Sequence, residues 1–189
     1  MSKETPDPGW GPAIRTLPLM VFPFVGMSRA VNSPNSLTVI RALWMLFVGA
    51  IMLMGAMAVL VLSTDGIDGA LSQGVALTVA ALLGAFLQLV AARLVADPDL
   101  SGEAMFVPSF QRWFFVRVAA AEVAALVSFG LFIASASALV YFVGGSIAFA
   151  AMWDIRPGRS RLRRVQAAAD EQQTGLQVVR ALERWGLTR

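Results

Sequence analysis

The sequence predicts an all-α membrane protein with four transmembrane helices, arranged as two antiparallel hairpins, and an amphipathic C-terminal helix. Three observations support this class. Hydrophobic residues make up 57% of the 189 residues and charged residues only 14%, and the mean hydropathy of +0.69 is far above that of a typical soluble domain. Four long apolar stretches divide the chain. All 15 Lys and Arg residues fall on one side of these four stretches.

The four stretches define the expected spans, at about residues 42–63, 70–95, 113–134 and 136–153. A helix needs about 20 apolar residues to cross a hydrocarbon core of about 30 Å, and the first three stretches reach that length. The fourth is short, so it is expected to use part of the connection at 135–137. That connection then leaves so few residues outside the bilayer that the third and fourth spans must be antiparallel neighbours.

The basic residues predict the orientation of the spans. The connections at 64–69 and 135–137 contain no Lys or Arg. Because Lys and Arg near span ends are retained in the cytoplasm, both termini and the middle loop are expected there. Trp44, Trp113 and Trp153 then fall at the cytoplasmic interface, where indole is favoured. The bias toward Arg and Ala suggests a GC-rich bacterial genome, so the expected location is the bacterial cytoplasmic membrane.

Residues 1–41 are expected to form a cytoplasmic leader. Its centre, at 17–26, is apolar but too short to span. Pro18 and Pro23 are expected to break a regular helix, so this segment would lie in the headgroup region with Trp10 and Phe24 as anchors. Alternatively, the segment is a docking peptide for another membrane subunit, because a partner surface would bury such an exposed apolar run.

Glu122 is the only acidic side chain inside any predicted span. It lies nine residues after Trp113, close to the middle of the bilayer. An ionised carboxylate there costs about 3 kcal/mol, so Glu122 is expected to face protein or water, to be paired, or to be protonated. One hypothesis is a proton or cation site. The other is an interhelical hydrogen-bonding group, neutral or paired with Arg117.

Small side chains mark two faces where helices are expected to approach closely. The predicted helix-packing residues are Ala76, Ala80, Gly84, Gly144 and Ala148. Gln88 continues the stripe of the second span, and we expect this face to receive Glu122. A polar layer of Gln88, Arg117 and Glu122 would then lie inside the bundle. The alternative is ordinary helix packing, with Gln88 forming a single hydrogen bond across an interface.

Residues 154–189 form a basic cytoplasmic tail. Its arginines are Arg156, Arg159, Arg161, Arg163 and Arg164. This cluster holds the end of the last span in the cytoplasm and is expected to attract anionic lipid at about 1 kcal/mol per cation. Farther on, Leu176, Leu182 and Trp185 mark the apolar side of a helix that would lie on the membrane or on a partner. The cluster is short and lacks interleaved aromatic residues, which argues against nucleic-acid binding.

The chain contains no cysteine and no histidine. These absences exclude a disulfide framework, a thiolate nucleophile, a Cys/His zinc site and a bis-histidine haem. No predicted span contains two carboxylates or a lysine, which intramembrane hydrolysis would use. We therefore expect no enzymatic activity, no cofactor and no metal site.

These observations favour an accessory or scaffold subunit of a larger bacterial cytoplasmic-membrane complex. Its expected partners are other membrane protein subunits and the lipid bilayer, with anionic lipids at the cytoplasmic face. The alternative function is a small proton- or cation-coupled transporter or channel component that uses Glu122 within the membrane.

Overall fold

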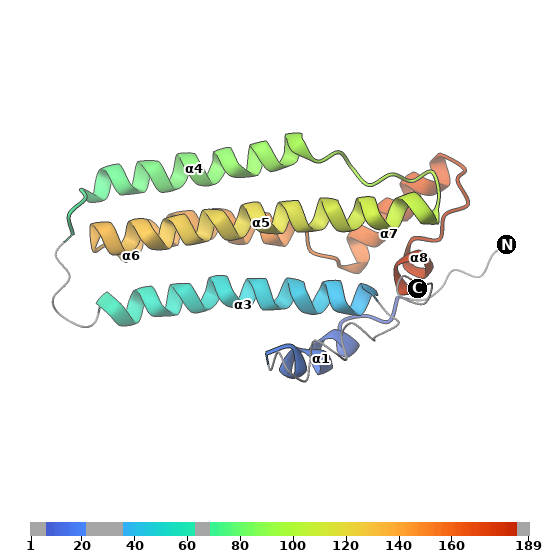
Figure 1. Ribbon diagram of the computed structural model, residues 1–189, viewed down its shortest axis with the longest axis horizontal. Helices are drawn as coiled ribbons and strands as arrows, with labels where there is room; N and C mark the ends of the chain where they lie inside the picture. Colours follow the sequence, from blue (N-terminus) through green and yellow to red (C-terminus); the bar gives the residue numbers. More distant parts are fainter. Residues whose placement is uncertain (1–6, 22–35, 63–68, 185–189) are drawn as a thin grey trace. The chain divides into compact units, whose positions relative to one another are not determined.

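A computed structural model describes residues 7–21, 36–62 and 69–184, and every regular element in these ranges is an α-helix. The helices are α1 (Gly11–Val21), α3 (Ser36–Leu62), α4 (Gln73–Leu94), α5 (Glu103–Ser135), α6 (Ala138–Asp154), α7 (Arg159–Glu171) and α8 (Val178–Arg184) (Figure 1). The predicted all-helical class is confirmed.

Three of these helices, α3, α4 and α5, are long and apolar enough to cross a membrane. Helix α6 has 17 residues and meets the length requirement only when it is counted together with α7, which follows after a short break. Large apolar side chains such as Leu53, Leu82 and Leu126 are exposed, which suits contact with lipid. The chain therefore has three to four candidate membrane-spanning helices, as expected for a multi-pass membrane protein.

Two of these helices begin earlier than the predicted spans. Helix α3 begins at Ser36 rather than at residue 42, and α5 begins at Glu103 rather than at residue 113. The additional turns carry buried apolar side chains, including Leu37 and Phe106. The apolar residues of these turns are dispersed among polar ones, so they do not extend the continuous apolar stretches from which the spans were predicted.

Helix α1 covers the first part of the apolar leader segment, and Pro18 lies inside it. The expectation that Pro18 interrupts a helix was therefore wrong. Proline fixes φ near the helical value, so a helix can pass through it at the cost of one backbone hydrogen bond. Residues 22–26 of the segment, including Phe24, lie outside the described residues.

The chain folds as two compact units. Unit 1 comprises Met1–Leu46, Asp97–Trp113 and Arg156–Arg189, and unit 2 comprises Phe47–Ala96 and Phe114–Ile155. The leader, the middle loop and the tail, which we treated as separate segments in the sequence, are therefore parts of the same unit.

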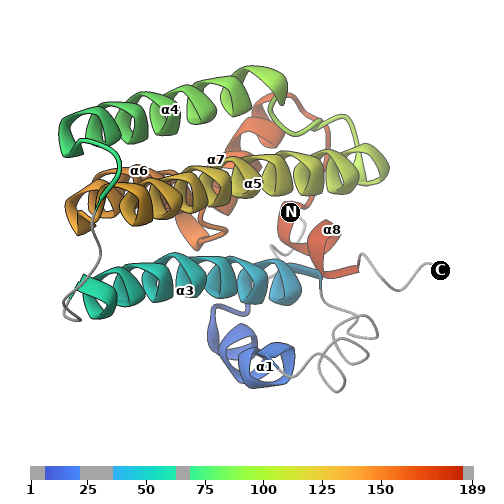
Figure 2. The same cartoon turned by 60° about the vertical axis from the view of Figure 1, so that its left-hand side comes forward.

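In unit 2, helix α6 makes contacts with residues of the other three helices. The Tyr141 hydroxyl of α6 donates a hydrogen bond to the Ile51 carbonyl of α3. A Cβ atom added to Gly144 would lie 3.6 Å from Cβ of Ala80 in α4, and it would overlap Ser128 in α5. Figure 2 shows α4, α5 and α6 running alongside one another, as in Figure 1. The smallness of Gly144 is what lets these helices approach.

Unit 1 has a hydrophobic core to which all of its segments contribute. The buried residues include Ala13, Leu37, Ile40, Phe106, Phe110, Trp113, Leu162, Ala169, Leu176, Val178 and Leu182. The apolar side of the tail helix is thus buried within the chain itself. For Leu176 and Leu182 the expected contact with the membrane or a partner was wrong, because both side chains are buried in unit 1.

Gln166 joins the two helices of the tail. Its side-chain amide donates a hydrogen bond to the Leu176 carbonyl at 2.8 Å, and its amide oxygen accepts one from the Val178 N–H at 2.9 Å. The second bond satisfies a backbone N–H at the beginning of α8 that has no partner within the helix. Gly175, with a φ of 67°, supplies the left-handed turn between α7 and α8.

Candidate functional site

The three residues of the predicted polar layer, Gln88, Arg117 and Glu122, lie in unit 2. Glu122 lies in α5 and Gln88 in α4, and within the described ranges neither Oε1 of Glu122 nor Nε2 of Gln88 has a hydrogen-bond partner, although both atoms are buried. Arg117 instead forms an ion pair with Asp154 of α6, with 3.3 Å between Nη1 and Oδ2. Residues five positions apart lie on different faces of a helix, so Arg117 and Glu122 are directed to different neighbours.

The five predicted helix-packing residues, Ala76, Ala80, Gly84, Gly144 and Ala148, are all buried. The stripe on α4 packs against α6, where Ala76 and Ala80 form a cluster with Val140. A Cβ atom added to Gly84 would contact the side chain of Ile147 in α6, so this stripe takes part in helix packing.

Two of the five tail arginines are engaged inside unit 1. The Arg156 guanidinium lies over two indoles, 4.9 Å from the ring centroid of Trp10 and 5.7 Å from that of Trp44. Arg159 lies 3.5 Å from the Asp7 carboxylate. Trp10, which we predicted as a membrane anchor, packs against Trp44 with 5.4 Å between ring centroids. These arginines therefore contribute to the fold of the unit.

The other three arginines lie on α7. The Arg161 guanidinium lies 4.5 Å from the ring centroid of Trp113, and Arg163 and Arg164 are exposed. Trp185, which we predicted to contact lipid or a partner, lies outside the described residues. The cluster that is continuous in sequence is thus divided between internal contacts and an outer surface.

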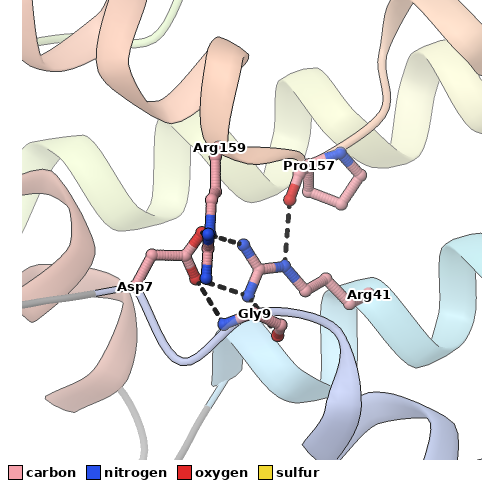
Figure 3. A network of polar contacts seen from close by, with 5 residues as sticks. All are labelled: Asp7, Gly9, Arg41, Pro157 and Arg159. Atoms are coloured by element: carbon pink, nitrogen blue, oxygen red, sulfur yellow. Dashed lines mark hydrogen bonds and ion pairs between the residues drawn. The ribbon is translucent and has the colours of Figure 1, made fainter.

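A polar network centred on Arg41 lies in the interior of unit 1 (Figure 3). Nη1 and Nη2 of Arg41 donate to the two carboxylate oxygens of Asp7 at 2.7 and 2.9 Å. Nη1 also donates to the Gly9 carbonyl at 2.7 Å, and Nε donates to the Pro157 carbonyl at 3.0 Å. The Arg41 side chain is only 1% exposed. Its guanidinium therefore joins the N-terminal segment, α3 and the segment before α7.

The charges around Asp7 keep its carboxylate ionised. Burial alone would raise the pKa of Asp7, but hydrogen bonds from Arg41 and from the Gly9 N–H, together with the charges of Arg41 and Arg159, bring this pKa below its ordinary value. Glu183 behaves in the opposite way, because burial and the negative charge of Asp7 raise its pKa, although Arg41 partly counters this rise. The network therefore stabilises the ionised form of Asp7 and disfavours the ionised form of Glu183.

The arrangement joins segments that are distant in the sequence. The Asp7 carboxylate already accepts hydrogen bonds from Arg41 and Gly9, and the described part of the chain holds no group of three or more His, Cys, Asp or Glu side chains that could hold a metal ion. Sequence reasoning missed this network. Arg41 directly precedes the first predicted span, where a basic residue is usual, and Asp7 lies 34 positions away from it.

We predict that acid weakens unit 1 through Asp7. The folded-state pKa of Asp7 is lowered, so its ion pair contributes full stability above the ordinary value of 3.8 and loses that contribution as pH falls through the lower, folded-state pKa. The fluorescence of Trp10 and Trp44 during acid titration measures this loss. Asp7→Asn is the control, and an unchanged acid transition in that variant would exclude Asp7 as its origin.

Comparison with family models, curated proteins and solved structures gives no match to this chain.

Proposed function

We propose that the chain is a non-catalytic accessory or scaffold subunit of a larger complex in the bacterial cytoplasmic membrane. In this proposal α3, α4, α5 and α6 cross the bilayer as two antiparallel hairpins, with both termini and unit 1 in the cytoplasm. The placement of the basic residues supports this orientation. Helix α7 remains in the cytoplasm because its arginines make crossing costly.

The proposal is supported by the folding of three segments that are separate in sequence into one unit, within which Arg41 joins the N-terminal segment to the segment before α7. A buried ion pair costs desolvation energy, and its best-attested use is to select one specific arrangement. Arg41 satisfies the carboxylate of Asp7 and two backbone carbonyls. Such a network produces a defined shape, which is what a protein needs when it presents a docking surface.

Helix α1 supplies a candidate contact surface for another subunit. Ile14 is 55% exposed, whereas Ala13 beside it is fully buried in the core of unit 1. An exposed isoleucine on a helix that is otherwise anchored is suited to contact with a protein. Arg163, which is exposed on α7, is suited to anionic lipid at the cytoplasmic face.

The test is purification of the tagged chain from its host into native nanodiscs, followed by mass spectrometry of the bound proteins. We expect stoichiometric membrane partners that are lost in Ile14→Asn, because this change removes apolar contact area. Arg15→Gln, an exposed neighbour on α1, is the matched control and should retain the partners. A homogeneous preparation of this chain alone would contradict the proposal.

A second candidate function is a proton- or cation-coupled transporter or channel component. It is favoured by the buried Glu122 Oε1 atom, which has no hydrogen-bond partner among the described residues. A carboxylate oxygen in this state can accept a proton or a cation. If the chain purifies alone, proton flux in proteoliposomes that is abolished by Glu122→Gln, and retained in the exposed Glu103→Gln control on the same helix, would support this candidate.

A further inference from the structure

Unit 1 contains a cavity of about 580 Å³, within the range of roughly 300–1,000 Å³ that is usual for small-molecule sites. Three parts of the unit line it: residues 97–100 before α5, the first turns of α5, and one face of α7. The lining includes two acidic, two basic and two aromatic side chains. They are Asp97, Asp99, Arg161, Arg164, Phe110 and Trp113.

The basic side chains come from one face of α7. Arg161 and Arg164 are three positions apart, so they are neighbours on the helix surface. The stacking of the Arg161 guanidinium over Trp113, at 4.5 Å from the ring centroid, orients this cation against the aromatic ring. A pair of guanidinium groups at this spacing is well suited to the oxygen atoms of a phosphate group.

The acidic side chains come from the segment before α5. Pro98 lies between Asp97 and Asp99, and its fixed φ restricts the backbone of this segment. The Asp99 N–H donates to the Ser109 hydroxyl at 2.9 Å, and the Asp99 carboxylate accepts a hydrogen bond from the Ser101 N–H at 2.9 Å. The second bond lowers the pKa of Asp99. The lining therefore presents the carboxylates of Asp97 and Asp99 on a restrained segment.

The aromatic part of the lining is rigid. Phe110 and Trp113 are each 1% exposed, and their ring centroids are 5.8 Å apart. Trp113 also directly precedes the part of α5 that belongs to unit 2, where the apolar run of the candidate span continues. Tryptophan at such a boundary is typical of the headgroup region of a membrane.

We infer that this cavity binds a phosphoethanolamine group. The phosphate contacts Arg161 and Arg164, and the primary ammonium contacts Asp97 and Asp99. Phe110 and Trp113 line the cavity but are each 1% exposed, so the ligand is held by its charged groups. A simple anion would be repelled by the two carboxylates, and a simple cation by the two guanidinium groups. A phosphodiester joined to an ammonium group places its negative charge at the guanidinium groups and its positive charge at the carboxylates.

Two sources offer this chemistry, the headgroup of phosphatidylethanolamine and soluble glycerophosphoethanolamine. To distinguish them, the intact chain is reconstituted in nanodiscs with equal amounts of phosphatidylethanolamine, phosphatidylcholine and phosphatidylglycerol. The lipids that remain bound after mild extraction are counted by native mass spectrometry. Calorimetric titration with glycerophosphoethanolamine measures binding of the soluble compound. The inference is independent of whether the chain is a subunit or a transporter.

We expect phosphatidylethanolamine to be retained over the other two lipids by about tenfold, because the others lack either the primary ammonium or any cation. Arg164→Gln and Asp97→Asn should each reduce retention by about tenfold, since each removes one charged contact. Both residues are exposed, so these changes leave the core intact. Arg163→Gln, on the same helix but outside the lining, should leave retention unchanged.

Tight binding of glycerophosphoethanolamine would assign the site to a soluble ligand, and retention of the lipid alone would assign it to the membrane; both results support the inference. Preferential retention of phosphatidylglycerol, unaffected by Asp97→Asn, would overturn it in favour of a simple anion site. Equal retention of all three lipids would overturn it as well.

Discussion

Replacement of Arg41 by methionine is expected to reduce the free energy of unfolding of unit 1 by about 3–5 kcal/mol. The variant retains most of the side-chain volume but leaves the Asp7 carboxylate, which is 12% exposed, without its principal counter-ion. It also leaves the carbonyls of Gly9 and Pro157 without the hydrogen bonds that Arg41 donates. Hydrogen exchange followed by mass spectrometry measures this loss separately in peptides of unit 1 and of unit 2.

The matched control for this prediction is Arg159→Gln. Arg159 contacts the same carboxylate at 3.5 Å, but its side chain is 65% exposed, so its removal is expected to cost less than about 1 kcal/mol. The double variant Asp7→Asn with Arg41→Met should cost less than the sum of the two single changes, because the partners act as a pair. Native protection of unit 1 in Arg41→Met would contradict a stabilising role of the network.

Substitution of Gly144 by alanine is expected to destabilise unit 2 by about 1–3 kcal/mol or more. An alanine Cβ would lie 1.7 Å from the Ser128 hydroxyl oxygen and 2.6 Å from Cβ of Ser128. Ser128 has little freedom to move, because it is 1% exposed and its hydroxyl donates to the Ala124 carbonyl at 2.7 Å. Thermal unfolding in detergent, measured as the loss of the monodisperse species, reports the effect.

Two further variants separate this overlap from a general effect of alanine in a membrane helix. Gly130→Ala introduces the same methyl group into α5, where no atom lies within 4 Å of the new Cβ, and it should be neutral or slightly stabilising because alanine favours helix. Ser128→Gly, combined with Gly144→Ala, should restore most of the lost stability. Equal destabilisation by Gly130→Ala would show that contact with Ser128 is not the cause.

The apolar helices were predictable from the sequence because their signal is local. A run of apolar residues identifies a candidate span without knowledge of its neighbours. The small residues on α4 were visible for the same reason, since their spacing of four places them on one helix face. The neighbour of that face was not predictable. Nothing in the spacing of Ala80 and Gly84 distinguishes α6 from α5 as the helix that packs against them.

The polar network of unit 1 could not be derived from sequence because its members are separated by long stretches of chain. Asp7 and Arg41 are 34 positions apart, and Arg41 and Pro157 are 116 positions apart. A charged residue beside an apolar stretch usually flanks a span, so Arg41 gave no sign of its burial. The sequence likewise identified Leu182 only as part of an amphipathic helix. It could not show which surface covers Leu182, because that surface is formed by segments that are remote in sequence.

The route of the chain through unit 1 also sets the order in which the unit can be completed during synthesis. The Ser36 hydroxyl donates to the carbonyl of Leu182, a residue 146 positions later. The ribosome therefore makes every candidate membrane helix before α8 emerges. Until then the surfaces of Leu37 and Ile40 that are buried in the finished unit lack their full cover. A chain that stops short of α8 would retain its membrane helices but expose apolar surface, which chaperones and proteases recognise.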